Sequence, residues 1–342
     1  MSSPLVTIVV VPRETFGFAL ASLESIYART APPFRLVYVD AGSPRRVRRA
    51  LEAASRERGF RLIRREHYLS PNQARNLGVR EVDTRYVVFL DNDVVVTPGW
   101  LEPLVERAEG SGAWIVGPIY LLGPPEAELV HMAGGDAAIH EERGGRYFHE
   151  RHRSMRRSLS EVSATLVPGT CELTEFHCML VRAEALRRLG PLDEELRSAM
   201  EHIDLCLLAR AAGGEVYFEP RSVIAYLPPP PLAWSDVPYL LLRWSEGWNR
   251  ASLEHFRAKW RLAADDPTIP WQLAWLADRR RVALGRLDRV LRAVLGERRS
   301  RWVARRLTTG LGRVVKRPVR AARDEKPVEP RSIVFPEAHG GS

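Results

Sequence analysis

Two aspartates stand one residue apart at the end of an apolar run, and their type and spacing indicate metal chemistry. The run covers Tyr86 to Leu90 and continues directly into Asp91, Asn92 and Asp93. It is typical of a strand that is buried on both faces of a sheet. Two carboxylates at the end of such a strand repel each other, and a divalent cation satisfies both of them. An acidic turn is the alternative, and this short motif alone does not separate the two.

The segments around this run alternate between strand-like and helix-like patterns. Strand-like segments cover residues 5–11, 36–39, 60–63 and 86–90, and helix-like segments cover residues 16–27, 45–58, 70–79 and 100–108. This alternation predicts an α/β fold with a mostly parallel, Rossmann-like sheet and helices on both faces. In such sheets ligands bind outside the carboxyl ends of the strands.

Acidic residues follow several of the predicted strands at that edge. Glu14 follows the first strand, Asp40 ends the second, and Asp91 and Asp93 end the fourth. We therefore expect these carboxylates to converge. Arg75 lies in the helix between them and offers a planar fork that suits phosphate, although a surface position on that helix is an equal alternative.

The next part of the chain, up to residue 230, is less regular. Strands are expected at residues 113–120, 175–181, 215–218 and 222–226, whereas residues 121–168 read as an irregular insertion. The histidines of that insertion, which include His131, His149 and His152, show no ligand spacing, so the sequence assigns them no metal. Glu201, His202 and Asp204 stand at the start of an amphipathic helix, where acidic groups also serve as ordinary caps.

Taken together, six segments resemble the family 2 glycosyltransferases. They are VTIVVVPRE, VYVDAGSP, SPNQARNLGV, YVVFLDNDVVVTPGWLEPL, HCMLVRAEALRRLGPLDEEL and EHIDLCLLARAAGGEVYFEP, in the expected order. The resemblance implies a nucleotide-diphospho-sugar transferase fold with a donor half at residues 1–110 and an acceptor half at residues 111–230. It also implies an inverting transfer of a sugar from a nucleotide-diphosphate donor to an acceptor hydroxyl, in polysaccharide, glycolipid or glycoconjugate synthesis.

The family's donor contacts carry over by position. The resemblance implies nucleotide contacts at Pro12 and Glu14, a contact with the base at Asp40, and contacts near the diphosphate at Arg75 and Asp91. It implies that Mn²⁺ or Mg²⁺ binds Asp93, together with Asp91. Such an ion neutralises the charge that develops on a leaving diphosphate.

Two departures from the family pattern concern the catalytic base and the metal. Where the family often has Glu-Asp, this chain has Glu201-His202. His202 is then either the catalytic base or a metal ligand. If it is a metal ligand, Glu201 or Asp204 is the base. Where many members have a metal-binding histidine, this chain has Tyr226. His177 stands where small residues are common, and it either faces the acceptor or packs in the core.

The charge of the chain is concentrated near its C-terminus. The 342 residues carry a net charge of +9, but residues 279–323 alone hold 16 Lys/Arg and 2 Asp/Glu, which leaves the rest at −5. Residues 231–324 read as a Trp-rich and then basic helical region, and residues 325–342 as a disordered tail. A basic amphipathic helix indicates an anionic membrane surface and suits a saccharide acceptor linked to lipid. Packing on the acidic body is the alternative.

Composition narrows the location and the competing functions. A hydrophobic content of 45%, three cysteines and no long apolar run favour a cytoplasmic protein, peripheral at the inner face of the membrane. Aromatic residues are not interleaved with the basic ones, so we expect no nucleic-acid partner. A catalytically silent nucleotide-sugar-binding or scaffold protein of the same fold is one alternative. A nucleotidyltransferase is another, although PRETFGF matches a phosphate-binding loop poorly.

Overall fold

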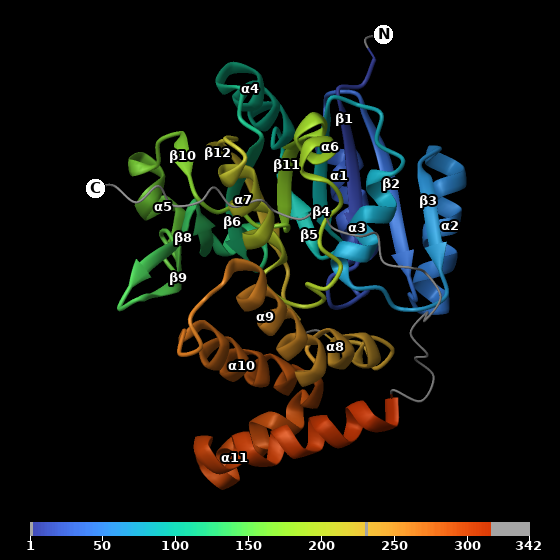
Figure 1. Ribbon diagram of the computed structural model, residues 1–342. Coiled ribbons are helices and arrows are strands. Elements are labelled where there is room, and N and C mark those ends of the chain that lie inside the picture. The colour runs from blue at the N-terminus through green and yellow to red at the C-terminus, as the bar shows by residue number, and fades with distance from the viewer. Residues whose placement is uncertain (1–2, 230–231, 316–342) are drawn as a thin grey trace.

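The computed structural model describes residues 3–229 and 232–315 (Figure 1). The expected disordered tail at residues 325–342 lies outside these ranges. Within them the chain forms an α/β body that is followed by a group of helices (Figure 1).

The body is organised around one sheet whose strand order is β10-β12-β6-β11-β4-β1-β2-β3. Six of these eight strands run in the same direction, and β10 and β11 run against them. Two further strands join at the side, because β5 pairs with β12 and β7 pairs with β6. The strands are β1 (Val6–Val11), β2 (Phe34–Ala41), β3 (Arg61–Arg65), β4 (Tyr86–Asp91), β5 (Val94–Val96), β6 (Ile115–Leu122), β7 (Val130–Ala133), β10 (Gly169–Cys171), β11 (Cys178–Arg182) and β12 (Val216–Tyr226). This arrangement confirms the predicted Rossmann-like, mostly parallel sheet.

The helices of the body pack on this sheet. They are α1 (Ala19–Arg29), α2 (Arg45–Arg58), α3 (Pro71–Val79), α4 (Leu101–Ser111), α6 (Ala183–Leu189) and α7 (Glu201–Ala211). Helix α3 packs against β1 and β2, and α4 packs against β6 and β12. Both β1 and β4 are buried along their whole length. Their continuous apolar sequences are what a central strand requires.

The expectation of an irregular insertion at residues 121–168 is wrong. This stretch contains η1 (Pro125–Ala127), β7, the hairpin of β8 (Gly135–Glu142) and β9 (Gly145–His152), α5 (Leu159–Val162) and η2 (Ser163–Thr165). The hairpin turns at Arg143 and Gly144, which both have positive φ (49° and 75°), as a tight turn between two strands requires. Much of the hairpin is exposed and polar, so its strands lack the apolar alternation that would have marked them.

The C-terminal helices lie below the body in Figure 1, beside the carboxyl ends of the parallel strands. They are α8 (Val237–Arg243), α9 (Glu246–Trp260), α10 (Thr268–Arg279), η3 (Arg280–Leu284) and α11 (Arg286–Val315). Gly296 interrupts α11, because its φ of 70° and ψ of 169° are not helical. Among the described residues, no helix combines the length and the apolar character needed to cross a membrane.

Candidate functional site

Three of the predicted acidic residues meet around Arg13 at the carboxyl edge of the sheet. The Arg13 guanidinium lies 3.0 Å from Glu14 Oε1, 3.5 Å from Asp91 Oδ2 and 3.8 Å from Asp93 Oδ2. All three carboxylates are buried. The edge therefore brings together residues that the sequence places about eighty positions apart. Arg13 itself was missed by the sequence reading, although it stands next to Glu14.

The residue between the two aspartates anchors the loop that follows β1. Asn92 Nδ2 donates to the Thr15 carbonyl over 2.8 Å, and the backbone N–H of Arg13 donates to Asn92 Oδ1 over 3.1 Å. These two bonds join the ends of β1 and β4. All three residues of the Asp-Asn-Asp sequence therefore contribute to the structure of the site.

Asp91 is held by a buried arginine from α3. Arg75 Nη2 donates to Asp91 Oδ1 over 2.8 Å, and its guanidinium lies 3.8 Å from the centre of the Phe176 ring. Burial alone would raise the pKa of Asp91, but Arg75, His177 and Arg13 together outweigh it and the pKa is lowered. Helix α3 begins with a capping box formed by Ser70 and Gln73, which fixes the position of its first turn. The alternative that Arg75 is a surface residue is therefore wrong.

Asp93 is the unsatisfied acid of the group. Both of its carboxylate oxygens are buried and have no hydrogen-bond partner within the described chain. Burial, reinforced by the negative charges of Asp91 and Glu14, raises the pKa of Asp93 well above its ordinary value, although Arg13 opposes the shift. Such a group binds a cation readily, because a buried carboxylate without partners is costly.

His177 completes a set of three candidate metal ligands with the two aspartates. Its Nδ1 lies 3.2 Å from Asp91 Oδ2, and one ligand atom each from Asp91, Asp93 and His177 lie within 4.8 Å of one another. Burial and the charge of Arg13 lower the pKa of His177 to about 4, so the imidazole is neutral at pH 7. His177 is buried in the protein interior, and it contacts the acidic site from there.

Glu14 is surrounded by donors from distant parts of the chain. Its carboxylate accepts hydrogen bonds from Tyr226 Oη (2.8 Å), Trp244 Nε1 (2.6 Å) and Arg279 Nη2 (2.5 Å). Burial alone would raise the pKa of Glu14, but Arg279 and Arg13 lower it to about 2. Tyr226, which replaces the histidine expected from the family, therefore lies in the site. Trp244 and Arg279 were not predicted, because no motif in the helical region marks them.

Asp40 lies at the same edge, but its carboxylate is already hydrogen-bonded within the protein. It accepts hydrogen bonds from Ser43 Oγ over 2.8 Å and from Arg64 Nη1 over 2.6 Å. The buried Tyr38 ring is close enough to both Asp40 and Asp93 that their charges raise its pKa, in addition to burial. Pro12 lies nearby, where its carbonyl accepts a bond from Tyr239 of α8 over 3.1 Å.

Glu201, His202 and Asp204 open helix α7 and differ in their contacts. Glu201 accepts a bond from Arg243 Nη2 over 2.7 Å, and the charges of Arg243 and Arg75 lower its pKa against the effect of burial. Asp204 is bonded through both oxygens, to Lys259 Nζ (2.7 Å) and Trp260 Nε1 (2.9 Å).

His202 is the member of this trio with an uncommitted atom. Its Nε2 is buried and has no hydrogen-bond partner among the described residues. Met200, two residues before His202 at the N-cap of α7, has a φ of 70° and is buried. A left-handed backbone costs a non-glycine residue roughly 1–2 kcal/mol. Such strain is frequent where a protein positions functional side chains.

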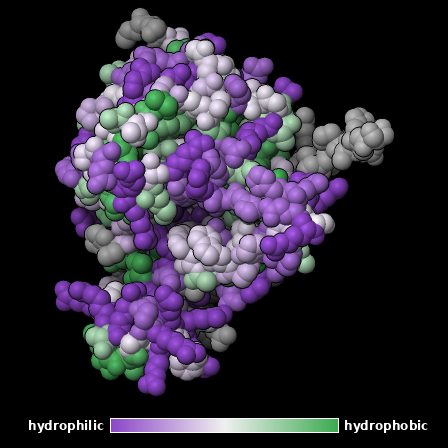
Figure 2. Space-filling view, turned by 90° about the vertical axis from the view of Figure 1, so that its left-hand side faces the viewer, coloured by the Kyte–Doolittle hydropathy of each residue, from purple (hydrophilic) through white to green (hydrophobic). Residues whose placement is uncertain are grey.

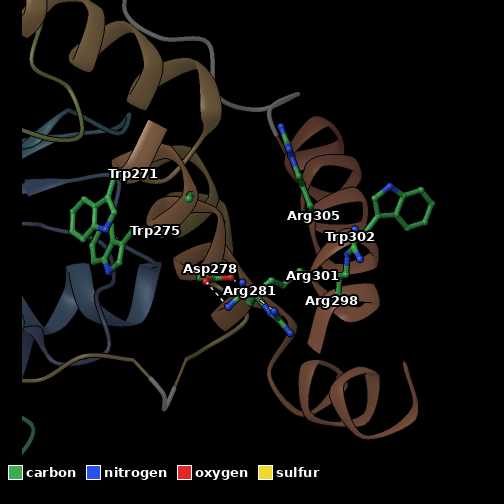
Figure 3. Close-up of a pocket in the computed structure, with 9 residues that line it drawn as sticks. Trp271, Trp275, Asp278, Arg281, Arg298, Arg301, Trp302 and Arg305 are labelled. Carbon is green, nitrogen blue, oxygen red and sulfur yellow. Dashed lines mark ion pairs between the residues drawn. The ribbon is translucent and has the colours of Figure 1, made fainter. Parts of the chain in front are cut away.

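A cavity of about 620 Å³ lies between α10 and α11 (Figure 3). Its lining includes Trp271, Trp275, Trp302, Arg281, Arg298, Arg301 and Arg305. Trp275 packs edge-on against Trp244 at 5.8 Å between ring centres, and Trp244 bonds to Glu14. The aromatic wall of the cavity therefore adjoins the Glu14 network.

The sequence of the sheet region matches a known family. Residues 7–189 match the model of Glycosyl transferase family 2. The chain belongs to this family. The family 2 assignment thus covers β1, the acidic edge and the strands up to α6, whereas the C-terminal helices lie outside the matched region.

Individual relatives are distant and longer than the matched region. The chain is 28% identical over 166 residues to a pre-mycofactocin glycosyltransferase of Mycobacterium tuberculosis, covering 48% of this chain and 32% of that protein. It is 33% identical over 112 residues to the succinoglycan biosynthesis protein ExoO of Rhizobium meliloti, covering 33% and 32%. The chain thus spans about a third of the length of these relatives.

A solved structure shows the same fold. The crystal structure of GalNAc-T7 with UDP, GalNAc and Mn²⁺ aligns with a TM-score of 0.50 and 16% identity. The alignment covers 80% of this chain and 55% of that one. At this identity the likeness concerns the fold.

Proposed function

We propose that this family 2 protein transfers a sugar from a nucleotide-diphosphate donor to an acceptor hydroxyl with inversion at the anomeric carbon. The observation that carries the proposal is the gathering of Glu14, Asp91 and Asp93 with Arg75 at one sheet edge, beside Glu201. An acidic metal-binding edge next to an arginine suits a diphosphate with its cation. We also propose that residues 1–110 form the donor half and residues 111–230 the acceptor half.

The candidate metal site suits Mn²⁺ or Mg²⁺. Asp93 offers two buried oxygens without hydrogen-bond partners in the described chain, Asp91 offers a further oxygen, and His177 offers a neutral imidazole nitrogen. Oxygen-rich sets of this kind favour hard divalent cations, and the single imidazole favours Mn²⁺ over Mg²⁺. When bound, such an ion neutralises negative charge on the leaving diphosphate. The fold neighbour that was crystallised with UDP and Mn²⁺ is consistent with this assignment.

The nucleoside is expected to bind along β1 and β2. Pro12, Glu14 and Asp40 lie there, and the Phe16, Tyr68 and Tyr239 rings stack nearby, with centres 5.0 to 6.3 Å apart. Asp40 must exchange one of its bonds to Ser43 or Arg64 for a bond to the base. Arg279 and Trp244 reach Glu14 from the C-terminal helices, so this region contributes to the donor site.

His202 is proposed as the base that accepts the proton of the acceptor hydroxyl. Asp204 is bonded through both oxygens and Glu201 is paired with Arg243, whereas the buried Nε2 of His202 has no partner in the described chain. An imidazole nitrogen that has no hydrogen-bond partner is available to accept a proton. His202 as a metal ligand is the competing role, in which Glu201 becomes the base.

A lipid-linked acceptor is proposed from the helical region. The cavity between α10 and α11 presents arginines and tryptophans next to the Glu14 network. Exposed apolar side chains also stand on α11, namely Leu287, Val290, Val294, Trp302 and Leu307. Figure 2 shows hydrophilic side chains gathered over this lower part of the molecule, with a hydrophobic patch at its end. A mixed basic and apolar surface suits an anionic membrane, and this supports the proposal of peripheral binding at a cytoplasmic face.

A catalytically silent nucleotide-sugar-binding protein is a second candidate, and one observation favours it. Arg13 and Arg279 already supply positive charge to Glu14, and Arg13 also approaches Asp91 and Asp93. A protein that neutralises its acidic edge internally needs less help from a metal. The family match gives no support to the nucleotidyltransferase alternative.

A binding and turnover panel tests the proposal. Thermal shifts with nucleoside diphosphates and Mn²⁺ identify the nucleotide, and release of nucleoside diphosphate from the matching sugar donor measures turnover. We expect metal-dependent binding and turnover that are both lost in Asp93→Asn. Asp83→Asn is the matched control, because Asp83 is exposed and its salt bridge to Arg35 is at the surface. Binding without turnover would favour the silent protein, and no binding would refute both candidates.

A further inference from the structure

A second group of metal-binding side chains lies next to the acidic edge. His131 of β7, His152 at the end of β9, and Glu175 in the segment before β11 place one ligand atom each within 4.8 Å of one another. His131 and His152 are partly buried, and the Glu175 side chain is 91% buried. The three residues come from separate strands or loops, so the spacing in the sequence gave no sign of the group. The sequence assigned these histidines no metal, but the fold brings His131 and His152 together with Glu175.

The contacts within the group are close but poorly aligned for hydrogen bonding. His131 Nε2 lies 3.0 Å from Glu175 Oε2, yet that buried oxygen has no hydrogen-bond partner in the described chain. Ligand atoms about 2.0–2.2 Å from one zinc ion, at angles of 90–110°, lie roughly 3–3.5 Å apart. The separation of nitrogen and oxygen is therefore what a shared metal would produce.

His152 and Glu150 lie next to this pair, and His152 needs only a small shift to share an ion with Glu175. His152 Nε2 lies 3.8 Å from Glu175 Oε1 and is bonded to Glu150 Oε1 over 2.8 Å. The rings of His131 and His152 stand nearly perpendicular, with centres 5.2 Å apart. A metal bound to His152 Nε2 replaces the proton shared with Glu150, whose carboxylate is then free to serve as a further ligand.

We propose that His131, His152 and Glu175 bind a structural Zn²⁺ ion, separate from the metal at Asp91 and Asp93. Two imidazoles and a carboxylate suit zinc, whereas the oxygen-rich aspartate site suits Mn²⁺ or Mg²⁺. The ion ties β7 and β9 to the segment that precedes β11. This inference does not depend on the proposed glycosyl transfer.

The zinc site also has a positioning role for the acidic edge. His177 Nε2 lies 3.7 Å from Glu175 Oε2, and His177 Nδ1 faces Asp91 Oδ2 at 3.2 Å. Fixing Glu175 on zinc therefore fixes the segment that holds His177 beside the aspartates. The ring of His177 stacks on Tyr226 at 4.2 Å, which limits its movement on the other side.

The proposal is tested on the full chain, freed of metal with a chelator and titrated with Zn²⁺ and with Co²⁺ as a spectroscopic substitute. We expect one tight equivalent, a d–d absorption spectrum of a low-coordinate Co²⁺ ion, and a higher melting temperature with Zn²⁺. His131→Gln and His152→Gln should each weaken binding by more than about tenfold. Asp93→Asn should retain the tight equivalent, because it changes only the aspartate site.

A matched control comes from the same hairpin. His140 and His149 also lie close together, with ring centres 5.1 Å apart, but outside the proposed group. The double variant His140→Gln/His149→Gln should keep zinc binding. Loss of binding in this control or in Asp93→Asn would overturn the proposal, as would binding that survives His131→Gln and His152→Gln, or no stoichiometric zinc at all.

X-ray absorption of the zinc-loaded wild type provides a measurement that does not depend on how the variants fold. Two imidazole ligands and oxygen neighbours at about 2.0–2.2 Å are expected. A spectrum without histidine scattering would contradict the assignment.

Discussion

Single side chains in this protein are best understood by whether their polar atoms already have partners. Asp204 has both oxygens hydrogen-bonded, whereas Asp93 and His202 retain buried atoms without hydrogen-bond partners in the described chain. An unpaired buried polar group is costly, so such a group at the acidic edge is a candidate to bind a ligand or a proton. This distinction separates residues that hold the fold from those that we propose to act on a substrate.

The roles of His202 and Asp204 lead to a first prediction. His202→Gln should reduce turnover by about 10²–10⁴-fold, because general-base catalysis contributes that much. Its affinity for nucleoside diphosphate should stay unchanged. Steady-state rates and calorimetric titration of the same preparation check both expectations. Asp204→Asn should instead lower the melting temperature more than the rate; an Asp204→Asn enzyme that folds normally but is inactive would reassign the base.

At the scale of elements, the position of α3 against the sheet is critical because this helix carries Arg75. A Cβ added at Gly78 would lie 2.3 Å from Val9 Cγ1 of β1, so the helix packs directly on the strand there. Gly78→Ala should destabilise the protein by about 1–3 kcal/mol, as overpacking does. It should also weaken donor binding by shifting Arg75. Chemical denaturation and nucleotide titration measure the two effects.

Gly110 of α4 supplies the control for that prediction. An added Cβ there would have no atom within 4 Å. Gly110→Ala should therefore leave donor binding unchanged and should stabilise the protein by up to about 1 kcal/mol through helix propensity. Equal losses of stability in both variants would show that packing on β1 is not the cause.

Lys259 of α9 is a largely buried cation that helps to attach this helix to the body. Lys259 Nζ bonds to Asp193 Oδ2 over 2.8 Å and to Asp204 Oδ2 over 2.7 Å. Lys259→Met should cost about 3–5 kcal/mol at pH 7, because it leaves two buried carboxylates without their shared partner. Denaturant melts of wild type and variant measure this difference.

The same attachment gives a pH dependence. Burial would raise the pKa of Asp193, but His255 and Lys259 outweigh it and lower the pKa. An acid whose folded pKa is depressed stabilises the fold above its unfolded pKa, near 3.9, and this contribution is lost as the pH falls through the folded value. Wild type should therefore lose stability below about pH 4. If an Asp193→Asn variant loses the same amount of stability below pH 4 as the wild type, other groups cause that loss.

The elements show where sequence patterns were sufficient and where they were not. The buried strands β1 and β4 and the Ser-Pro start of α3 carry strong local signals, so the sheet and the acidic edge were predictable. The β8–β9 hairpin is exposed and polar, and its signal is weak. The zinc group and the contacts of Trp244 and Arg279 with Glu14 depend on residues far apart in the chain. Tertiary packing alone brings them together, and no spacing rule describes it.

At the scale of the whole molecule, charge is separated between an acidic body and a basic C-terminal region. Arg298, Arg299 and Arg306 are exposed on α11. Replacing all three by glutamine should weaken binding to anionic vesicles by up to about 3 kcal/mol, since each basic residue near such a surface contributes about 1 kcal/mol. Flotation with anionic and neutral vesicles, at low and high salt, tests this. Equal flotation of wild type and variant would contradict membrane binding by these arginines. The basic region would then have the alternative role of packing on the acidic body.

The bond from the Trp244 indole to Glu14 has a practical consequence. A nucleotide that competes for Glu14 changes the surroundings of a buried tryptophan 230 residues further along the chain. Intrinsic fluorescence should then report donor occupancy without any label. By the same linkage, a ligand that binds near Trp244 and Arg279 should change the affinity for the proposed sugar donor. If the acceptor binds at these helices, as we propose, Trp244 and Arg279 would link its binding to that of the donor.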